Sequence, residues 1–214
     1  MISVKFLCCS DLHGEVQARD FLFGFIADAK PDCILIAGDI ANDSANFAEE
    51  LFGGLEKTSV PFFAVHGNKD GPYVREFIAS TPNGIHGRCV GFGGFKICGS
   101  GGSTPTPYGT PSEYPEKYYE GLFAKMPIDD KTIILSHAPP KNTQADLIGA
   151  GNHGGCQALR DVIEEKKPLA VICGHVHETH LVENLGSTLI VKVAPLMRKH
   201  CAVLEVPSLK AELL

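Results

Sequence analysis

Five short apolar runs in this sequence each end in a cluster of polar residues, and this repeated pattern most restricts what the chain can fold into. The first run, Val4 to Cys9, leads directly into Ser10-Asp11-Leu12-His13-Gly14. Such runs, bounded by Gly and polar residues, are typical of strands buried on both faces. The other runs and their clusters are 33–37 with Gly38-Asp39, 61–65 with His66-Gly67-Asn68-Lys69-Asp70, 132–135 with Ser136-His137, and 169–173 with Gly174-His175-Val176-His177-Glu178. The pattern predicts buried strands with functional groups at their C-terminal ends.

Helical patterns separate the first three of these runs. Between residues 15 and 30, apolar residues recur at helical spacing, and Pro31 follows as a stop signal. Asn42-Asp43-Ser44 supplies N-cap candidates for a second helix that runs to about residue 57, and a short third helix is predicted over 73–79. This alternation of strand and helix indicates βαβ units and a largely parallel sheet. In such sheets ligands bind beyond the carboxyl ends of the strands, where each polar cluster lies.

The second half of the chain changes character. Two apolar runs around Gly91-Phe92-Gly93-Gly94 predict a hairpin within 88–101. A long loop rich in Gly, Ser, Thr and Pro follows over 99–115, and long loops in compact domains are often functional. Helices are predicted over 112–125 and 156–166, and strands of an antiparallel tail over 179–185, 188–193 and 200–206. We therefore expect an α/β fold with two sheets, formed by one domain over residues 1–214.

Composition disfavours several other classes of protein. The apolar content of 44% and the charged content of 21% are those of an ordinary globular protein. The net charge of −6 shows no bulk electrostatic signature of a nucleic-acid-binding protein. No apolar run is long enough to suggest a membrane span, and the N-terminus lacks the layout of a signal peptide. The eight cysteines form no CxxC pair, so we expect free thiols in a reducing cytoplasm.

The polar clusters contain a set of residues suited to metal binding. The set comprises two carboxylates, one carboxamide and four imidazoles: Asp11, His13, Asp39, Asn68, His137, His175 and His177. Oxygen and nitrogen ligands without thiolate favour Mn²⁺, Fe or Zn²⁺ over Mg²⁺ or Ca²⁺, and they argue against Cu(I). Seven protein ligands are too many for a single catalytic metal that keeps an open position. The set therefore predicts two metals that share a bridging carboxylate.

Each of these residues also has a plainer interpretation. A lone His more often belongs to the core or the surface, and Asp or Asn at the end of a strand is common in turns. The ordered set, with every member at a strand end, favours ligation. His66 lies close to Asn68 in the sequence but is expected to support the site rather than to bind a metal. His86, His180 and His200 are expected to have no functional role.

The clusters, in this order, resemble the motifs of the calcineurin-like metallophosphoesterases, which are D-x-H, G-D, G-N-[H/x]-[D/E], H and G-H-x-H. The resemblance spans residues 11 to 177. Within the family the chain is similar to small, capless, Icc-related phosphoesterases, because it shares a Gly-Gly-Ser-x-Pro-Thr-Pro loop at 101–107 and His153-Gly154-Gly155 ahead of a helix. The resemblance implies a four-layer αββα sandwich, in which two packed mixed sheets are flanked by helices.

Carried over by position, the resemblance also implies a ligand set for each metal. The first metal would be held by Asp11, His13, Asp39 and His177. The second would be held by Asp39, Asn68, His137 and His175, with Asp39 as the bridge. The implied cofactor is two divalent cations, with Mn²⁺ as the expected metal and Fe, Zn²⁺ or Ni²⁺ as alternatives. The implied activity is hydrolysis of a phosphate ester, in the first instance a phosphodiester, by attack of a hydroxide that bridges the two metals.

Two further residues are candidates for a role in the reaction. Many family members have His directly after the Gly-Asn pair, where this chain has Lys69. Lys69 could donate a proton, contact the phosphate or point to solvent, and Asp39, Asn68 and Lys69 form the candidate catalytic set. Without a strong acid, we expect a preference for phosphodiesters with good leaving groups over alkyl monoesters. His153 precedes a Gly pair at a predicted helix start, where anions bind well, so His153 and Asn68 are the candidates for substrate contact.

Two other functions stay open from the sequence alone. The same fold can lose its metals and serve as a protein-binding scaffold, as the retromer scaffold subunit that resembles these enzymes does, although all seven ligand positions here hold competent residues. A nuclease would need a basic channel or a cap domain, and neither is obvious. The expected partner is a small-molecule phosphate ester, no membrane contact is expected, and the oligomeric state is open, a homo-oligomer included.

Overall fold

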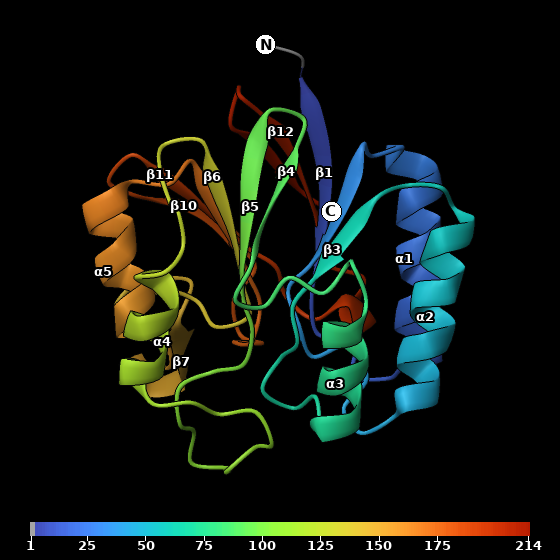
Figure 1. Ribbon diagram of the computed structural model, residues 1–214, viewed down its shortest axis with the longest axis horizontal. Coiled ribbons are helices and arrows are strands. Elements are labelled where there is room, and N and C mark those ends of the chain that lie inside the picture. Colours follow the sequence, from blue (N-terminus) through green and yellow to red (C-terminus); the bar gives the residue numbers. More distant parts are fainter. Residues whose placement is uncertain (1–2) are drawn as a thin grey trace.

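The computed structural model describes residues 3–214 of the chain and shows two β-sheets packed face to face with helices outside them (Figure 1). The helices of the first sheet are α1 (Val16–Ala29), α2 (Ala45–Lys57) and α3 (Pro72–Ser80). The helices of the second sheet are α4 (Glu116–Phe123) and α5 (Gln157–Lys166). The predicted four-layer αββα sandwich is confirmed.

The first sheet has the strand order β13-β12-β1-β2-β3. Its strands are β1 (Val4–Cys9), β2 (Cys33–Ile36), β3 (Phe62–Ala64), β12 (Ala202–Val206) and β13 (Lys210–Leu213). The strands β1, β2 and β3 run parallel, whereas β12 is antiparallel to β1, with Phe6 opposite Leu204. The carboxyl ends of the three parallel strands therefore lie at one edge of the sheet.

The second sheet has the order β10-β11-β9-β6-β5-β4. Its strands are β4 (Cys89–Phe92), β5 (Phe95–Ser100), β6 (Thr132–Ser136), β9 (Ala170–Cys173), β10 (Leu181–Leu185) and β11 (Thr188–Lys192). The four central strands are parallel and the two edge strands are antiparallel. The remaining elements are the short strands β7 (Leu147–Ile148) and β8 (Asn152–His153) and the 3₁₀ helices η1 (Gly149–Gly151) and η2 (Leu196–Arg198).

Side-chain alternation along β1 shows how the layers are assembled. Phe6 and Cys8 point into the core between the two sheets. Leu7 and Cys9 point the other way, into the core under α1 and α2. All four side chains are completely buried, which explains why this strand appears in the sequence as an unbroken apolar run.

The first two helices begin and end as their sequences predict. Helix α1 buries Ala18, Leu22 and Ile26, which are four residues apart and so share one face, and the chain leaves the helix at Lys30 in a left-handed conformation. Of the three N-cap candidates for α2, Ser44 is the one that caps the helix, because its Oγ accepts a hydrogen bond from the N–H of Phe47.

Helix α4 is shorter than predicted, and the reason lies in the preceding loop. The prediction began at residue 112, but the helix begins at Glu116, after Pro115. The N–H of Ser112 donates to the carbonyl of Asn68, and the N–H of Tyr114 donates to the carbonyl of Ser103. These donors hold the loop in place beside the strand ends.

The C-terminal strands are only partly as predicted. Strands β10 and β11 form an antiparallel hairpin, but β11 runs parallel to β9, and β12 leaves for the other sheet. The strand β13 was not predicted; it pairs with β12 at the sheet edge and its residues are mostly exposed. Because these strands are adjacent in the sequence, one antiparallel tail was expected. In the structure the chain crosses from β11 in the second sheet to β12 in the first.

The expectation that all eight cysteines are free thiols is wrong for one pair. Cys89 and Cys98 form a disulfide that joins β4 to β5. They are directly opposite each other in the antiparallel register, with their Cα atoms 4.1 Å apart, so the hairpin itself brings the two sulfurs together. The six other cysteines are free and buried.

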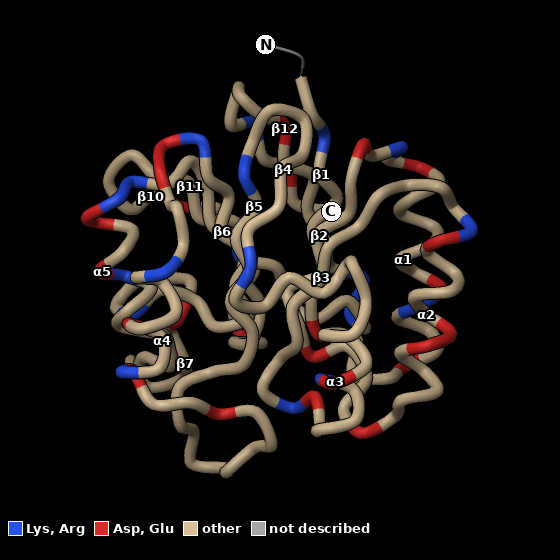
Figure 2. Tube along the Cα trace, viewed as in Figure 1, with Lys and Arg blue, Asp and Glu red and all other residues tan. Residues whose placement is uncertain are grey.

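Charged residues lie mainly on the helices and loops, and in the view of Figure 2 acidic and basic residues are interspersed there. None of the helices within residues 3–214 combines the length and the apolar character that a membrane crossing needs.

We predict that Phe6→Ala strongly destabilises the fold. Phe6 is fully buried between the sheets and its ring centroid lies 5.9 Å from that of Phe92. Truncation of such a side chain leaves a cavity, so the free energy of unfolding should fall by about 3–5 kcal/mol. Urea denaturation followed by circular dichroism measures this change. The control Tyr73→Ala, at an exposed site on α3, should change the free energy of unfolding by less than about 0.5 kcal/mol; equal effects of the two substitutions would contradict the assigned core.

Candidate metal centre

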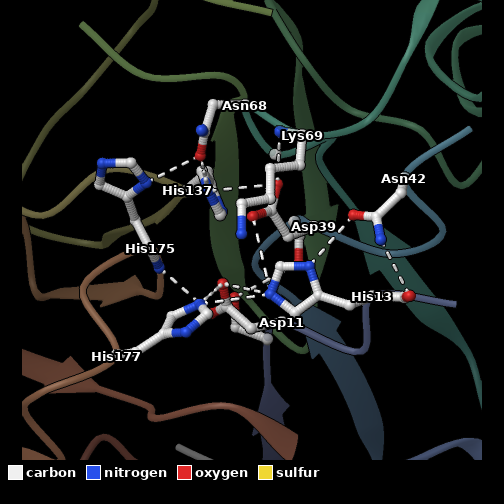
Figure 3. Close-up of polar contacts among 12 residues, drawn as sticks. Asp11, His13, Asp39, Asn42, Asn68, Lys69, His137, His175 and His177 are labelled. Atoms are coloured by element: carbon white, nitrogen blue, oxygen red, sulfur yellow. Dashed lines mark hydrogen bonds and ion pairs between the residues drawn. The ribbon is translucent and has the colours of Figure 1, made fainter. Parts of the chain in front are cut away.

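The seven predicted ligands lie together where strands of both sheets end (Figure 3). Asp11 and His13 follow β1, Asp39 follows β2, Asn68 follows β3, His137 follows β6, and His175 and His177 follow β9. The two sheets therefore contribute to one cluster, although its members are spread from residue 11 to residue 177 of the sequence.

One group of ligand atoms gathers around Asp11. The Nε2 atom of His177 lies 3.1 Å from Asp11 Oδ1 and 3.2 Å from His13 Nε2. His13 Nε2 is also 3.6 Å from Asp11 Oδ1 and 3.9 Å from Asp39 Oδ2. The ligand atoms of Asp11, His13 and His177 lie within 4.8 Å of one another, close enough to hold a single metal ion, and so do those of Asp11, Asp39 and His137.

A second group gathers around Asn68. Its Oδ1 atom lies 2.8 Å from His137 Nε2 and 2.8 Å from His175 Nδ1. His137 Nε2 is in turn 3.5 Å from Asp39 Oδ1. The carboxylate of Asp39 thus lies between the two groups, with Oδ2 toward the first and Oδ1 toward the second (Figure 3).

The hydrogen-bond partners of His137 and Asn68 show which atoms face the centre. His137 Nδ1 lies 2.7 Å from the carbonyl of Ala37 and donates to it, so the other ring nitrogen carries a lone pair. The Asn68 amide nitrogen donates to Thr110 Oγ1, so its Oδ1 is also an acceptor. Two acceptors 2.8 Å apart repel each other unless a cation lies between them.

His13 is oriented in the same way. Its Nδ1 lies 3.1 Å from Asn42 Oδ1, and the Asn42 amide nitrogen donates to the His13 carbonyl, which fixes the amide orientation. Nδ1 therefore carries the proton, and Nε2 presents its lone pair to Asp11 and His177. A partner that fixes the far nitrogen of an imidazole is typical of metal-binding histidines, so this donor set fits divalent cations.

The charges of the centre are strongly perturbed by burial. Burial, together with the negative charges of Asp11 and Asp70, raises the pKa of Asp39 to about 8. Burial also opposes ionisation of Asp11, but its contact with His177 and the nearby His137 hold the pKa of Asp11 well below its usual range. Burial lowers the pKa of His175 to about 3. A bound cation would stabilise the neutral form of the imidazoles and the ionised form of the closely spaced carboxyl groups.

The backbone of the cluster is strained. Four of its residues have left-handed φ angles, namely Asp11 (57°), His13 (54°), Asp39 (48°) and His175 (72°). Such conformations cost about 1–3 kcal/mol each for a non-Gly residue and are found mainly at functional sites. These backbone conformations direct the side chains of separate loops toward the same point.

Two motif glycines allow the loops to approach so closely. A Cβ atom at Gly67 would collide with the carboxylate and backbone of Asp39, and one at Gly174 would collide with Ser10. Glycine is therefore required beside Asn68 and beside His175 for a steric reason, independent of any metal.

Comparison with known families supports this geometry. The family model for calcineurin-like phosphoesterases matches residues 4–179. The chain belongs to the calcineurin-like phosphoesterase family. The resemblance noted from the five motifs is thereby confirmed.

Two relatives match over most of the chain. The uncharacterised protein MJ1162 of Methanocaldococcus jannaschii is 29% identical over 199 residues, which cover 90% of this chain and 88% of that protein. A probable glycerophosphodiester phosphodiesterase, GpdQ, of Arcobacter nitrofigilis is 28% identical over 157 residues, which cover 69% of this chain. The match spans 57% of that relative's length.

Solved structures share the fold of this calcineurin-like phosphoesterase. The crystal structure of TT1561 of Thermus thermophilus has a TM-score of 0.78 at 20% identity and covers 100% of this chain and 99% of its own. A dimetal phosphatase from Danio rerio has a TM-score of 0.64 at 12% identity, with 94% of this chain and 91% of that chain covered. Similarity at these identities shows a common fold.

Asp70 supports the family cluster, although the sequence interpretation gave it no role. Its buried carboxylate accepts hydrogen bonds from the N–H groups of Gly67, Ile40, Ala41 and Asn42, at 2.8–3.2 Å. These bonds tie the loop after β2 to the loop after β3. The available signal was its place in the same polar cluster as Asn68.

Three other supporting residues were also missed. Asn42 was taken as an N-cap candidate, but it orients His13. Thr110 holds the Asn68 amide and donates its own hydroxyl to Glu113. The fully buried ammonium of Lys192 donates to the carbonyl of Thr179, two residues after His177, and to that of the adjacent Val193. Each of these contacts depends on a loop conformation that no local pattern encodes.

Of the two candidate reaction residues, Lys69 is hydrogen-bonded to the cluster and His153 is not. The N–H of Lys69 donates to Asp39 Oδ1 at 2.8 Å, its side chain is exposed, and within residues 3–214 its ammonium has no hydrogen bond or ion pair. His153 lies on β8, where its Nδ1 is 2.7 Å from Asp146 Oδ1. His153 is thus tied to the loop after β6 and has no polar contact with the cluster among the described residues.

We predict that Asn42→Ala weakens metal binding without unfolding the protein. The substitution removes the acceptor that holds the His13 ring, and loss of such a partner typically costs about 10–100-fold in metal affinity. Isothermal titration of the chelator-treated protein with Mn²⁺ measures the change. Asn184→Ala, at an exposed position on β10, is the control and should leave the affinity unchanged. Unchanged affinity in Asn42→Ala would show that Asn42 does not orient a ligand.

Proposed function

We propose that this chain is a dinuclear-metal-dependent phosphoesterase that acts on phosphodiesters. Membership in the calcineurin-like phosphoesterase family supports a phosphoester hydrolase. The Arcobacter relative is named as a probable glycerophosphodiester phosphodiesterase, which supports the choice of a diester.

One observation carries the proposal: two acceptor atoms, His137 Nε2 and Asn68 Oδ1, face each other at the centre with no hydrogen atom between them. His137 Nε2 and Asn68 Oδ1 are 2.8 Å apart, and both have their hydrogen-bond donors engaged on the far side. A structural network of buried polar groups would pair donors with acceptors. Two divalent cations, one for each group of ligand atoms, would satisfy these lone pairs.

In this proposal the ligands divide as the distances suggest. Asp11, His13, Asp39 and His177 hold the first cation, and Asp39, Asn68, His137 and His175 hold the second. Asp39 bridges them, since each of its oxygens faces one group. A donor set of oxygen and nitrogen atoms without sulfur favours Mn²⁺, with Fe, Zn²⁺ and Ni²⁺ as alternatives.

The residues of the chain then prepare the centre for hydrolysis. When bound, the two cations lower the pKa of a water molecule and neutralise the charge that develops on the phosphate. Asp39 is held in place by the N–H of Lys69, and Asn68 is held by Thr110. Because these partners are already in position, little reorganisation accompanies the reaction.

Lys69 is the proposed leaving-group partner. It follows Asn68 directly, and its exposed ammonium is not engaged by any carboxylate among residues 3–214. It can therefore contact an anionic substrate or donate a proton to the departing oxygen. His153 remains a proposed substrate contact, with its ring oriented by Asp146.

We predict that activity depends on divalent metal and on Asp39. Hydrolysis of bis(4-nitrophenyl) phosphate, followed by absorbance, should be abolished by EDTA and restored by Mn²⁺. Asp39→Asn removes the bridging charge and should lower kcat/KM by about 100-fold or more. Elemental analysis of the purified protein reports the native metal.

Asp28→Asn, an exposed carboxylate on α1, is the matched control and should retain full activity. A protein that binds no transition metal and that Mn²⁺ does not activate would instead be a scaffold of this fold.

We predict that Lys69→Ala acts on leaving-group departure. General acid catalysis contributes about 10²–10⁴-fold, mainly for poor leaving groups. In a series of aryl methyl phosphodiesters, kcat should fall most for the phenols with the highest pKa and should change by less than about threefold for nitrophenol.

The dependence of log kcat on leaving-group pKa should therefore be steeper in the variant than in the unaltered protein. Lys57→Ala, at the exposed end of α2, serves as the control. Parallel dependences for Lys69→Ala and the unaltered protein would exclude Lys69 as the proton donor.

A further inference from the structure

A cavity of about 360 Å³ is lined by residues of α3, of α4 and of the loops beside them. Its volume lies within the range of small-molecule sites, about 300–1,000 Å³. Its wall combines aromatic rings with guanidinium groups: His66, His86, Tyr114, Tyr118, Arg75 and Arg88. None of the seven predicted metal ligands is among its described lining residues, so it is distinct from the metal centre.

Two of the rings form a flat platform. His86 Nε2 lies 2.7 Å from Tyr118 Oη, and the two ring planes are within 9° of each other, with the ring centroids 6.1 Å apart. The N–H of Gly101 donates to His86 Nδ1, which makes Nε2 the donor to Tyr118. Tyr114 stacks on Tyr118 at a centroid distance of 4.4 Å. A broad, rigid aromatic surface of this kind suits stacking of another planar ring.

The charge of the pocket comes from its arginines. Arg75 and Arg88 have no ion pair with a carboxylate among residues 3–214, and Glu76 is the one carboxylate in the described lining. Burial lowers the pKa of His86 to about 4, so this ring is neutral near pH 7. Two guanidiniums against one carboxylate leave a net positive pocket.

The arginines are also held in position. Arg75 Nη1 donates to Ser112 Oγ at 3.0 Å. Arg88 Nη2 donates to the carbonyls of Pro82 and Gly84. Each guanidinium thus uses part of its donor set on the protein and keeps further N–H groups, in a planar arrangement that matches phosphate oxygens.

The pocket is connected to the metal centre through one serine. Ser112 accepts from Arg75, donates its hydroxyl to the Asp70 carbonyl, and donates its N–H to the Asn68 carbonyl. His66, two residues before Asn68, contributes its ring to the pocket. A ligand bound to Arg75 would therefore be linked to the Asn68 segment through Ser112.

We propose that this pocket binds a nucleoside monophosphate at a site separate from the metal centre, with the base stacked on the His86–Tyr118 platform and the phosphate bound by Arg75 and Arg88. The platform provides a surface on which a planar base can stack. The two guanidinium groups, which have no ion pair with a carboxylate among residues 3–214, can bind the phosphate. The proposal does not depend on the hydrolytic activity proposed above.

The test titrates the purified chain with AMP, by calorimetry, and repeats the titration in EDTA. EDTA removes divalent cations, and with them any phosphate binding at the metal centre. We expect saturable binding that persists in EDTA, with adenosine and inorganic phosphate each binding more weakly than AMP. Loss of AMP binding in EDTA, or no saturable binding at millimolar AMP, would overturn the proposal.

Paired variants locate the site. Arg88→Ala and Tyr118→Leu should each weaken AMP binding about tenfold, because they remove a phosphate contact or the stacking surface. The matched controls are Arg19→Ala, at a partly exposed site on α1, and Tyr73→Leu, at an exposed site on α3. Both controls should bind AMP as the unaltered protein does. Equal affinity in all four variants would overturn the proposal.

Saturation-transfer NMR on the unaltered protein gives a readout that does not depend on how the variants fold. Irradiation of the protein should transfer magnetisation to the adenine protons more strongly than to the ribose protons, since the base contacts the rings. Stronger transfer to the ribose would contradict base stacking. Hydrolysis of the nitrophenyl diester is measured separately, so failure of AMP binding leaves the proposed function intact, and the reverse also holds.

Discussion

The crowding of polar ligand atoms at the strand ends is the constraint on which the rest of this structure depends. Carboxylate oxygens, an amide oxygen and imidazole nitrogens converge there, some of them only 2.8 Å apart. Water would separate such groups in an unfolded chain. Here they are held by donors and acceptors on their outer sides: the amide of Asn42 for His13, the hydroxyl of Thr110 for Asn68, and four N–H groups around Asp70.

Apolar burial in the layered fold offsets the free-energy cost of the strained backbone at the cluster. Three apolar cores are filled by completely buried side chains such as Phe6 between the sheets, Leu22 under the helices of the first sheet and Leu159 under those of the second. Each buried aliphatic or aromatic side chain contributes about 1.5–3 kcal/mol. That gain can offset left-handed φ angles at Asp11 and Asp39, each of which costs about 1–3 kcal/mol. The rigid sheets keep the strained turns in place, so the ligand atoms are prearranged for cations.

Much of the site could be predicted because its chemistry is local. Asp11, Asp39 and His175 each stand at the end of an apolar run, and a parallel sheet places such ends at one edge. The supporting residues could not be predicted in this way. Asn42 looks like a helix cap in the sequence, and only the turn between β2 and α2 reveals that Ser44 caps the helix while Asn42 holds His13. The pairing of Cys89 with Cys98 depends in the same way on strand register.

The sequence by itself determined the positions of most strands and helices, although not of β7, β8 or β13. It also determined the identity of the seven converging residues and membership in the calcineurin-like phosphoesterase family, because periodicity and motif order are properties of neighbouring residues. Only the tertiary structure decided which imidazole nitrogen faces the centre, that β12 joins β1 while β11 joins β9, and that His66, His86 and Tyr118 line a second, cationic pocket. These features arise from contacts between segments that are distant in the chain. Their geometry follows from how the two sheets pack, and that packing is a property of the whole molecule.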